Sequence, residues 1–224
     1  MNKKEVTEEC FRILKEGIDK VEEKYFNFAI VGKDKDVSTI YRERVYCYEI
    51  YHQVRILQDN EYSLIKESVD INCEPDKRGN TWFKEPVNPD MIFHKAGNID
   101  ENYLVLEVKN NLNGEINDSD DKPIGVYKDI INLYRFIKDS NYEMACFYLY
   151  GQEADKIKEV IPKVLKVIQT DYIGNKEEKK ILEQIKILVK SKYDEKVKEY
   201  SLKEDNEKQT YTLIEQGIYI KRQP

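Results

Sequence analysis

The sequence has few of the residues from which disulfide frameworks and zinc sites are built. Among its 224 residues are four cysteines and two histidines, and no two cysteines are spaced as in a Cys-X-X-Cys motif. Paired spacing of that kind is typical of structural zinc sites and of disulfide-rich domains. We therefore expect four reduced thiols in a cytoplasmic protein, with neither a zinc centre nor a disulfide framework.

Long apolar runs are also lacking. No run of 18 apolar residues occurs, so the sequence predicts no membrane span and no membrane partner. The first residues, MNKKEVTEECFRIL, lack the apolar segment and the small-residue cleavage site of a secretory signal. Both observations favour a cytoplasmic location.

Basic residues are not in excess. The chain has 43 acidic and 37 basic residues and a net charge of −6. Proteins that bind DNA over their whole surface usually have a strong basic excess, because neutralising phosphates drives their affinity. This class is therefore disfavoured, while a local basic cleft or a partner that grips the nucleic acid stays open. The hydrophobic fraction of 40%, with 17 tyrosines and 7 phenylalanines, is enough to build a core.

Hydrophobic periodicity predicts alternating helices and strands. Helices are expected over residues 3–25, 38–58, 125–138, 153–169 and 176–199. Strands are expected over residues 26–31, 62–65, 88–95, 103–110 and 144–150, with a strand or short hairpin in the tail at 210–222. This order predicts an α/β sandwich built round a small mixed sheet.

The strands at 88–95 and 103–110 are expected to form a hairpin. If its loop centres between Gly97 and Ile99, Asp90 lies opposite Glu107, at a separation of roughly 5 Å between Cβ atoms. Side chains alternate between the faces of a strand, so Lys109 shares the face of Glu107. The apolar residues of the two strands then go to the opposite, buried face: Met91, Phe93, Leu104 and Leu106.

Two carboxylates placed so close together need a compensating charge. At ~4 Å their repulsion is about 1 kcal/mol in water and ~4 kcal/mol at an effective dielectric of 20. A divalent cation such as Mg²⁺ compensates directly, because it prefers oxygen ligands. Lys109 beside the pair can hold a water molecule or a developing negative charge. Carboxylates, metal and lysine together are what phosphodiester hydrolysis requires.

Pro89-Asp90, followed by Glu107-Val108-Lys109 after a short hairpin, resembles the PD-(D/E)xK nuclease superfamily. The resemblance implies a restriction-endonuclease-like α/β core, in which a helix, three strands, a helix and a strand follow in order. It implies Mg²⁺ as cofactor, with Mn²⁺ able to substitute, and DNA as substrate, while RNA stays open as an alternative. In many members an acid from the preceding helix joins the metal site. The matching candidate is Glu49, and Glu43 on the same helix is a weaker one.

The resemblance covers about residues 38–150. We therefore expect residues 1–150 to form a nuclease-like core, with residues 151–224 as a C-terminal helical extension that ends in a short β tail and packs on that core. The amphipathic segment 176–199 either covers one face of the sheet or offers a surface to a partner.

Other residues near the expected site have two interpretations each. Lys122, Lys128 and Arg135 are possible phosphate contacts, or they form a solvated helix face. His52 is a candidate general base, although a packing role is more common for such a histidine. Trp82 either stacks on a base or anchors a loop in the core.

The function these residues predict is a metal-dependent DNA endonuclease with Asp90, Glu107, Lys109 and Glu49 as catalytic residues. Asp90, Glu107 and Glu49 would bind the metal. The alternative is a catalytically inactive binding or regulatory subunit of a larger complex on the same fold. The residues themselves also have a purely structural interpretation, in which Asp90 begins a strand and Glu107 and Lys109 form a solvated strand face. The acidic net charge also leaves open a homodimer or a partner protein.

Overall fold

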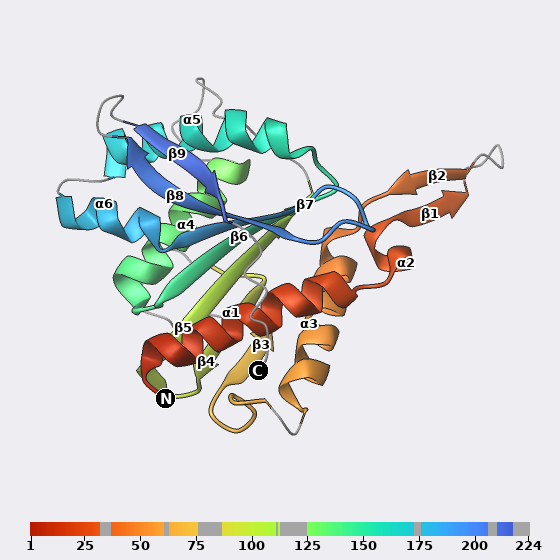
Figure 1. Cartoon of the computed structure of the whole chain (residues 1–224), viewed down its shortest axis with the longest axis horizontal. Coiled ribbons are helices and arrows are strands. Elements are labelled where there is room, and N and C mark those ends of the chain that lie inside the picture. Colours follow the sequence, from red (N-terminus) through yellow and green to blue (C-terminus); the bar gives the residue numbers. More distant parts are fainter. Residues whose placement is uncertain are drawn as a thin grey trace, which may run out of the picture.

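The computed structural model describes eight stretches of the chain: residues 1–31, 37–60, 63–75, 87–110, 112, 125–172, 176–205 and 210–216. Figure 1 shows the arrangement of the helices and strands. The helices are α1 (Lys3–Lys20), α2 (Glu23–Phe26), α3 (Glu43–Gln58), α4 (Gly125–Ser140), α5 (Ala154–Tyr172) and α6 (Lys176–Glu183). The strands are β1 (Phe28–Val31), β2 (Val37–Ile40), β3 (Asp70–Cys73), β4 (Met91–Lys95), β5 (Asn98–Lys109), β6 (Met144–Tyr150), β7 (Ile185–Lys190), β8 (Lys198–Asp205) and β9 (Thr210–Glu215).

Seven of these strands form one mixed central sheet, in the order β3-β4-β5-β6-β7-β8-β9. Strands β5, β6 and β7 are parallel, and the remaining neighbours are antiparallel. Strands β1 and β2 form a separate antiparallel ribbon that projects from the body of the molecule in Figure 1. The mixed α/β class predicted from the sequence is confirmed.

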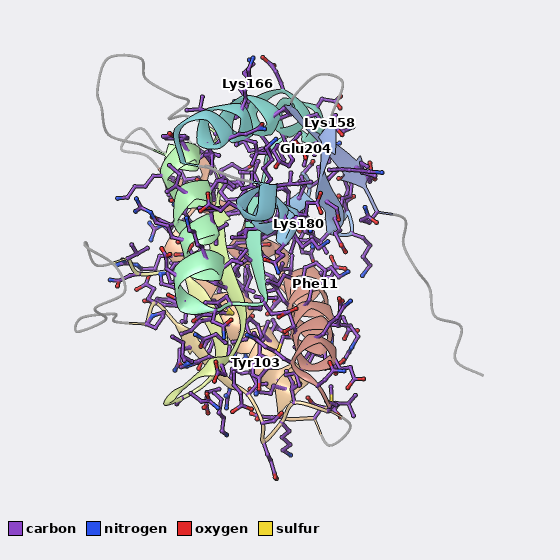
Figure 2. All side chains as sticks on the ribbon, turned by 90° about the vertical axis from the view of Figure 1, so that its left-hand side faces the viewer. Phe11, Tyr103, Lys158, Lys166, Lys180 and Glu204 are labelled. Atoms are coloured by element: carbon purple, nitrogen blue, oxygen red, sulfur yellow. The ribbon has the colours of Figure 1, made fainter. Side chains whose placement is uncertain are left out.

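Helices cover both faces of this sheet. One hydrophobic core joins the sheet to α1 and α3, and a second joins it to α4, α5 and α6. Viewed from the side in Figure 2, α1, which carries Phe11, and α4 lie on opposite sides of the strands. The central strand β6 (MACFYLY) is buried along its whole length, which explains its unbroken apolar sequence. None of the described helices is long and apolar enough to cross a membrane.

The predicted hairpin has the expected register. Met91 pairs with Leu106, and Phe93 pairs with Leu104, so the next position places Asp90 opposite Glu107. After Phe93 the pairing register shifts, as at a β-bulge, so the end of the hairpin near its loop is irregular. The four apolar residues expected on one face, Met91, Phe93, Leu104 and Leu106, all lie in the core beneath α1 and α3.

Three segments differ from the sequence prediction. The expected helix over 176–199 ends at Glu183 and is followed by the buried strand β7. Its apolar residues satisfy helical spacing and also form a strand-length run, and pairing with β6 selects the strand. The expected helix over 38–58 starts only at Glu43, because residues 37–40 form β2. The expected strand near residue 65 is a turn, and β3 follows it.

The C-terminal part of the chain is also less helical than expected. Beyond residue 150 it contains α5 and α6, but it contributes β7, β8 and β9 to the central sheet as well. The sheet therefore continues across the boundary predicted at residue 150.

Candidate functional site

Asp90 lies immediately before β4, where the backbone pairing of β4 with β5 stops. Its side chain continues the connection, because Oδ2 accepts a hydrogen bond of 2.7 Å from the backbone N–H of Val108. Its carbonyl oxygen accepts another, of 2.8 Å, from the backbone N–H of Glu74. Asp90 is thus held from both neighbouring strands, and its carboxylate has a fixed position beside β5.

Glu107 lies next to Asp90 and is almost completely buried, with 5% of its surface exposed. The two carboxyl groups are close enough for each to shift the pKa of the other. Burial raises the pKa of Glu107 well above its usual range, and the charges of Asp90 and Asp129 raise it further. Burial also raises the pKa of Asp90, although the Val108 N–H and the Lys109 ammonium oppose that shift. Burial therefore favours the protonated form of Glu107 when no cation is bound.

Lys109 lies at the end of β5, between two further acids. Its Nζ is 3.1 Å from Oε1 of Glu43 and 3.7 Å from Oδ2 of Asp129. Burial lowers the pKa of Lys109, but the carboxylates of Asp129 and Glu43 outweigh that effect and the net shift is upward. Lys109 is therefore a permanent cation in this arrangement and not a base.

Asp129 was not predicted from the sequence. It lies near the start of α4, the helix that connects β5 to β6, and its side chain is 14% exposed. Its Oδ2 is buried and makes no hydrogen bond to any described residue. Burial raises the pKa of Asp129 to about 6, with Lys109 opposing the shift. A signal was present in the sequence, since Asp129 follows Val126 by three positions and precedes Leu133 by four, within the apolar stripe of α4.

The helix acid that reaches Lys109 is Glu43, the weaker of the two candidates. Glu43 starts α3 and is 32% exposed. Glu49, the preferred candidate, accepts a hydrogen bond of 2.7 Å from Nε2 of Gln53, further along the same helix. No contact among the described residues brings Glu49 to Asp90, Glu107 or Lys109.

No protein-family model, curated protein or solved structure matches this chain. A function must therefore be argued from the geometry and chemistry of the site itself.

The other residues singled out in the sequence are placed as follows. Lys128 is exposed on α4 and its charge lowers the pKa of the adjacent Asp129, so it lies at the rim of the site. Arg135 is partly exposed further along α4, and His52 is exposed on α3. Lys122 and Trp82 lie outside the described residues.

The group comprises Glu43, Asp90, Glu107 and Asp129 round one cation, Lys109. Carboxylate oxygens are the ligands Mg²⁺ prefers, and the charges of Asp90 and Asp129 add to burial in raising the pKa of Glu107. Within the described residues, however, no three acidic, histidine or cysteine side chains are close enough together to hold a metal ion. In this arrangement Asp90 and Glu107 thus offer two ligands, and any others would be water, substrate oxygens or a shifted side chain.

Proposed function

We propose that this chain is a metal-dependent nuclease, specifically a DNA endonuclease, and that Asp90 and Glu107 bind its Mg²⁺ ion. The observation that carries the proposal is the position of the partly buried Asp90 opposite the buried Glu107, beside a lysine that is always charged. Burying two acids against each other costs stability unless a cation compensates. A pair of acids that lowers the stability of the metal-free protein in this way fits a role in binding a cation.

The order of the elements supports the proposal. Helix α3 is followed by the antiparallel strands β3, β4 and β5, then by α4 and by β6, which is parallel to β5. This is the order that the resemblance to the PD-(D/E)xK superfamily implies. Asp90 lies at the start of the second of the three strands, and Glu107 and Lys109 at the end of the third, as the motif requires.

A bound divalent cation would lower the pKa of a water molecule and stabilise the negative charge that develops on the phosphate. Lys109 cannot accept the proton of that water, because its neighbours keep it protonated. Its role is therefore to orient the water by hydrogen bonding and to stabilise the developing charge. Glu43 and Asp129 hold the ammonium group from two sides, so they fix where it acts.

DNA is the substrate we propose, with RNA less favoured. Lys128 is exposed beside Asp129, so it is available to contact a phosphate near the site. Because the chain as a whole is acidic, we propose that a second copy or a partner protein supplies further phosphate contacts.

The proposal is tested by nicking of supercoiled plasmid DNA in Mg²⁺ and in Mn²⁺. Asp90→Asn should reduce the rate by at least roughly 100-fold, since losing even an outer partner of a metal site costs 10- to 100-fold. Asp100→Asn is a matched control, because Asp100 is exposed on the same hairpin. Equal nicking by Asp90→Asn and the control would overturn the proposal. Metal binding without nicking by the wild type would instead support a non-catalytic nuclease-fold subunit.

A further inference from the structure

Two of the four cysteines face each other beside the candidate site. Sγ of Cys47, on α3, lies 3.9 Å from Sγ of Cys73, at the end of β3, and 26 residues separate them in the chain. Both thiols are free. Cys47 is buried, whereas Cys73 is partly exposed and can be reached from solvent. The pair therefore combines one accessible thiol with a second one directly behind it.

Neighbouring contacts keep the two sulfur atoms together. Arg44 forms an ion pair of 2.7 Å with Glu74, the residue after Cys73, and the Tyr48 hydroxyl donates to the same carboxylate at 3.1 Å. One turn further along α3, the Tyr51 hydroxyl donates to the carbonyl oxygen of Ile71 at 3.3 Å. These contacts lie on both sides of Cys47 along α3. The helix is thus fastened to β3 at the position of the thiol pair.

We propose that Cys47 and Cys73 are a redox-active thiol pair that a hydroperoxide oxidises to an intramolecular disulfide. The sulfur atoms must approach by about 1.9 Å from their 3.9 Å separation to reach the bond length of a disulfide. Such a distance is within reach of side-chain rotations and small backbone shifts. The proposal concerns the thiols alone and does not depend on nuclease activity.

The reaction proceeds in two balanced steps. Cys73 Sγ, as thiolate, attacks one oxygen of hydrogen peroxide; the O–O bond breaks, and the leaving hydroxide takes the thiol proton to become water. Cys47 Sγ then attacks the sulfur of the resulting sulfenic acid, and its proton leaves with the hydroxyl as a second water. Two thiols lose two electrons in total, and one peroxide is reduced to two waters.

The order of attack follows from the exposure of the two thiols. Cys73 is partly exposed, so peroxide reaches it first, whereas Cys47 is buried behind it. Cys10 and Cys146 provide internal controls, since both are fully buried and burial raises the pKa of each. They should stay reduced under conditions that oxidise the pair.

The disulfide would form next to the residues of the candidate site. Cys47 follows Glu43 by one helical turn, and its Sγ lies 3.9 Å from the carbonyl oxygen of Asp90. Linking Cys47 to Cys73 would fix α3 against β3 at the point where both elements meet Asp90. Oxidation would therefore restrict α3, which carries Glu43, and the end of β3, where the Glu74 N–H binds the carbonyl oxygen of Asp90.

The test is peptide mapping of the folded wild-type chain after treatment with hydrogen peroxide and alkylation of the remaining thiols. We expect a peptide pair linked through Cys47 and Cys73, an intact mass lower by two hydrogen atoms, and complete reversal by dithiothreitol. Cys10 and Cys146 should be alkylated only after unfolding. Recovery of Cys73 as reduced thiol or sulfinic acid without that link, or a link between two chains, would overturn the proposal.

Two variants resolve the order of the steps. In Cys47→Ala the oxidation of Cys73 should stop at the sulfenic acid, which dimedone traps, whereas in Cys73→Ser the Cys47 thiol should stay reduced. Oxidation of Cys47 in Cys73→Ser at the wild-type rate would contradict first attack by Cys73. If either substitution prevents folding, mapping of the wild-type chain alone decides the proposal.

Discussion

Replacing Asp129 by asparagine should stabilise the metal-free protein, and only above a defined pH. Burial raises the pKa of Asp129 from 3.8 to about 6, so its ionised form costs about 3 kcal/mol in the folded state. A carboxyl group whose pKa is raised on folding stays protonated in the folded chain at pH values where it is already ionised in the unfolded chain. Its contribution to stability is complete below pH ~4 and is lost as the pH rises through about 6. Asparagine keeps the shape and cannot ionise, so it avoids this loss.

The free energy of unfolding of wild type and Asp129→Asn should therefore diverge with pH. We expect the difference in favour of the variant to grow by about 2.4 kcal/mol between pH 4 and pH 7.5, which corresponds to roughly 5–10 °C in Tm for a chain of this size. Urea unfolding in EDTA at several pH values measures it, because the chelator removes cations that would neutralise the site. A difference that is constant with pH, or that shrinks as the pH rises, would refute the electrostatic reasoning.

Three further predictions separate the roles of individual residues. Glu43→Gln should slow plasmid nicking by about 10-fold or more, whereas Glu49→Gln on the same helix should change the rate by less than about 2-fold. The reason is that Glu43 contacts Lys109, while Glu49 contacts Gln53. Equal effects of the two substitutions would contradict the choice of Glu43 as the helix acid of the site. Lys109→Met should lower the nicking rate by about 100-fold without weakening Mg²⁺ binding, because the ammonium group stabilises the developing charge and does not bind the metal. A parallel loss of Mg²⁺ affinity, measured by calorimetry, would indicate a structural role for Lys109 instead. Gly17→Ala should lower the free energy of unfolding by about 1–3 kcal/mol in urea titrations. The added methyl group would lie 2.6 Å from Cγ2 of Val54, where α1 packs on α3. An unchanged midpoint of the urea transition would show that the two helices can move apart at little cost.

The parts of the fold that follow from local pattern were predictable from the sequence. The hairpin register followed from the loop position and from alternation, and it placed Asp90 opposite Glu107 before any tertiary information was used. Strand β7 was not predictable in the same way, because its apolar residues fit a helix and a strand equally well. Pairing with β6, which is a tertiary property, decided between them.

The site was predictable in its strand residues and less so in its helix residues. Which acid of α3 reaches Lys109 depends on how the helix docks on the sheet, and sequence spacing does not set that docking. Asp129 belongs to α4, whose start is positioned by the crossover from β5 to β6. An acid within an apolar helical stripe is a usable signal, and it identifies Asp129 in retrospect.

Asp90 and Glu107 are proposed above to hold a divalent cation together. Titration calorimetry of Mg²⁺ binding at neutral pH, in buffers of different ionisation enthalpy, tests it most directly. We expect binding to release protons, because burial favours the protonated form of Glu107 in the metal-free protein and the ion binds the carboxylate. Both the binding and the proton release should disappear in Glu107→Gln. Mg²⁺ binding that persists unchanged in Glu107→Gln, or a wild-type chain that binds neither Mg²⁺ nor Mn²⁺, would contradict the claim.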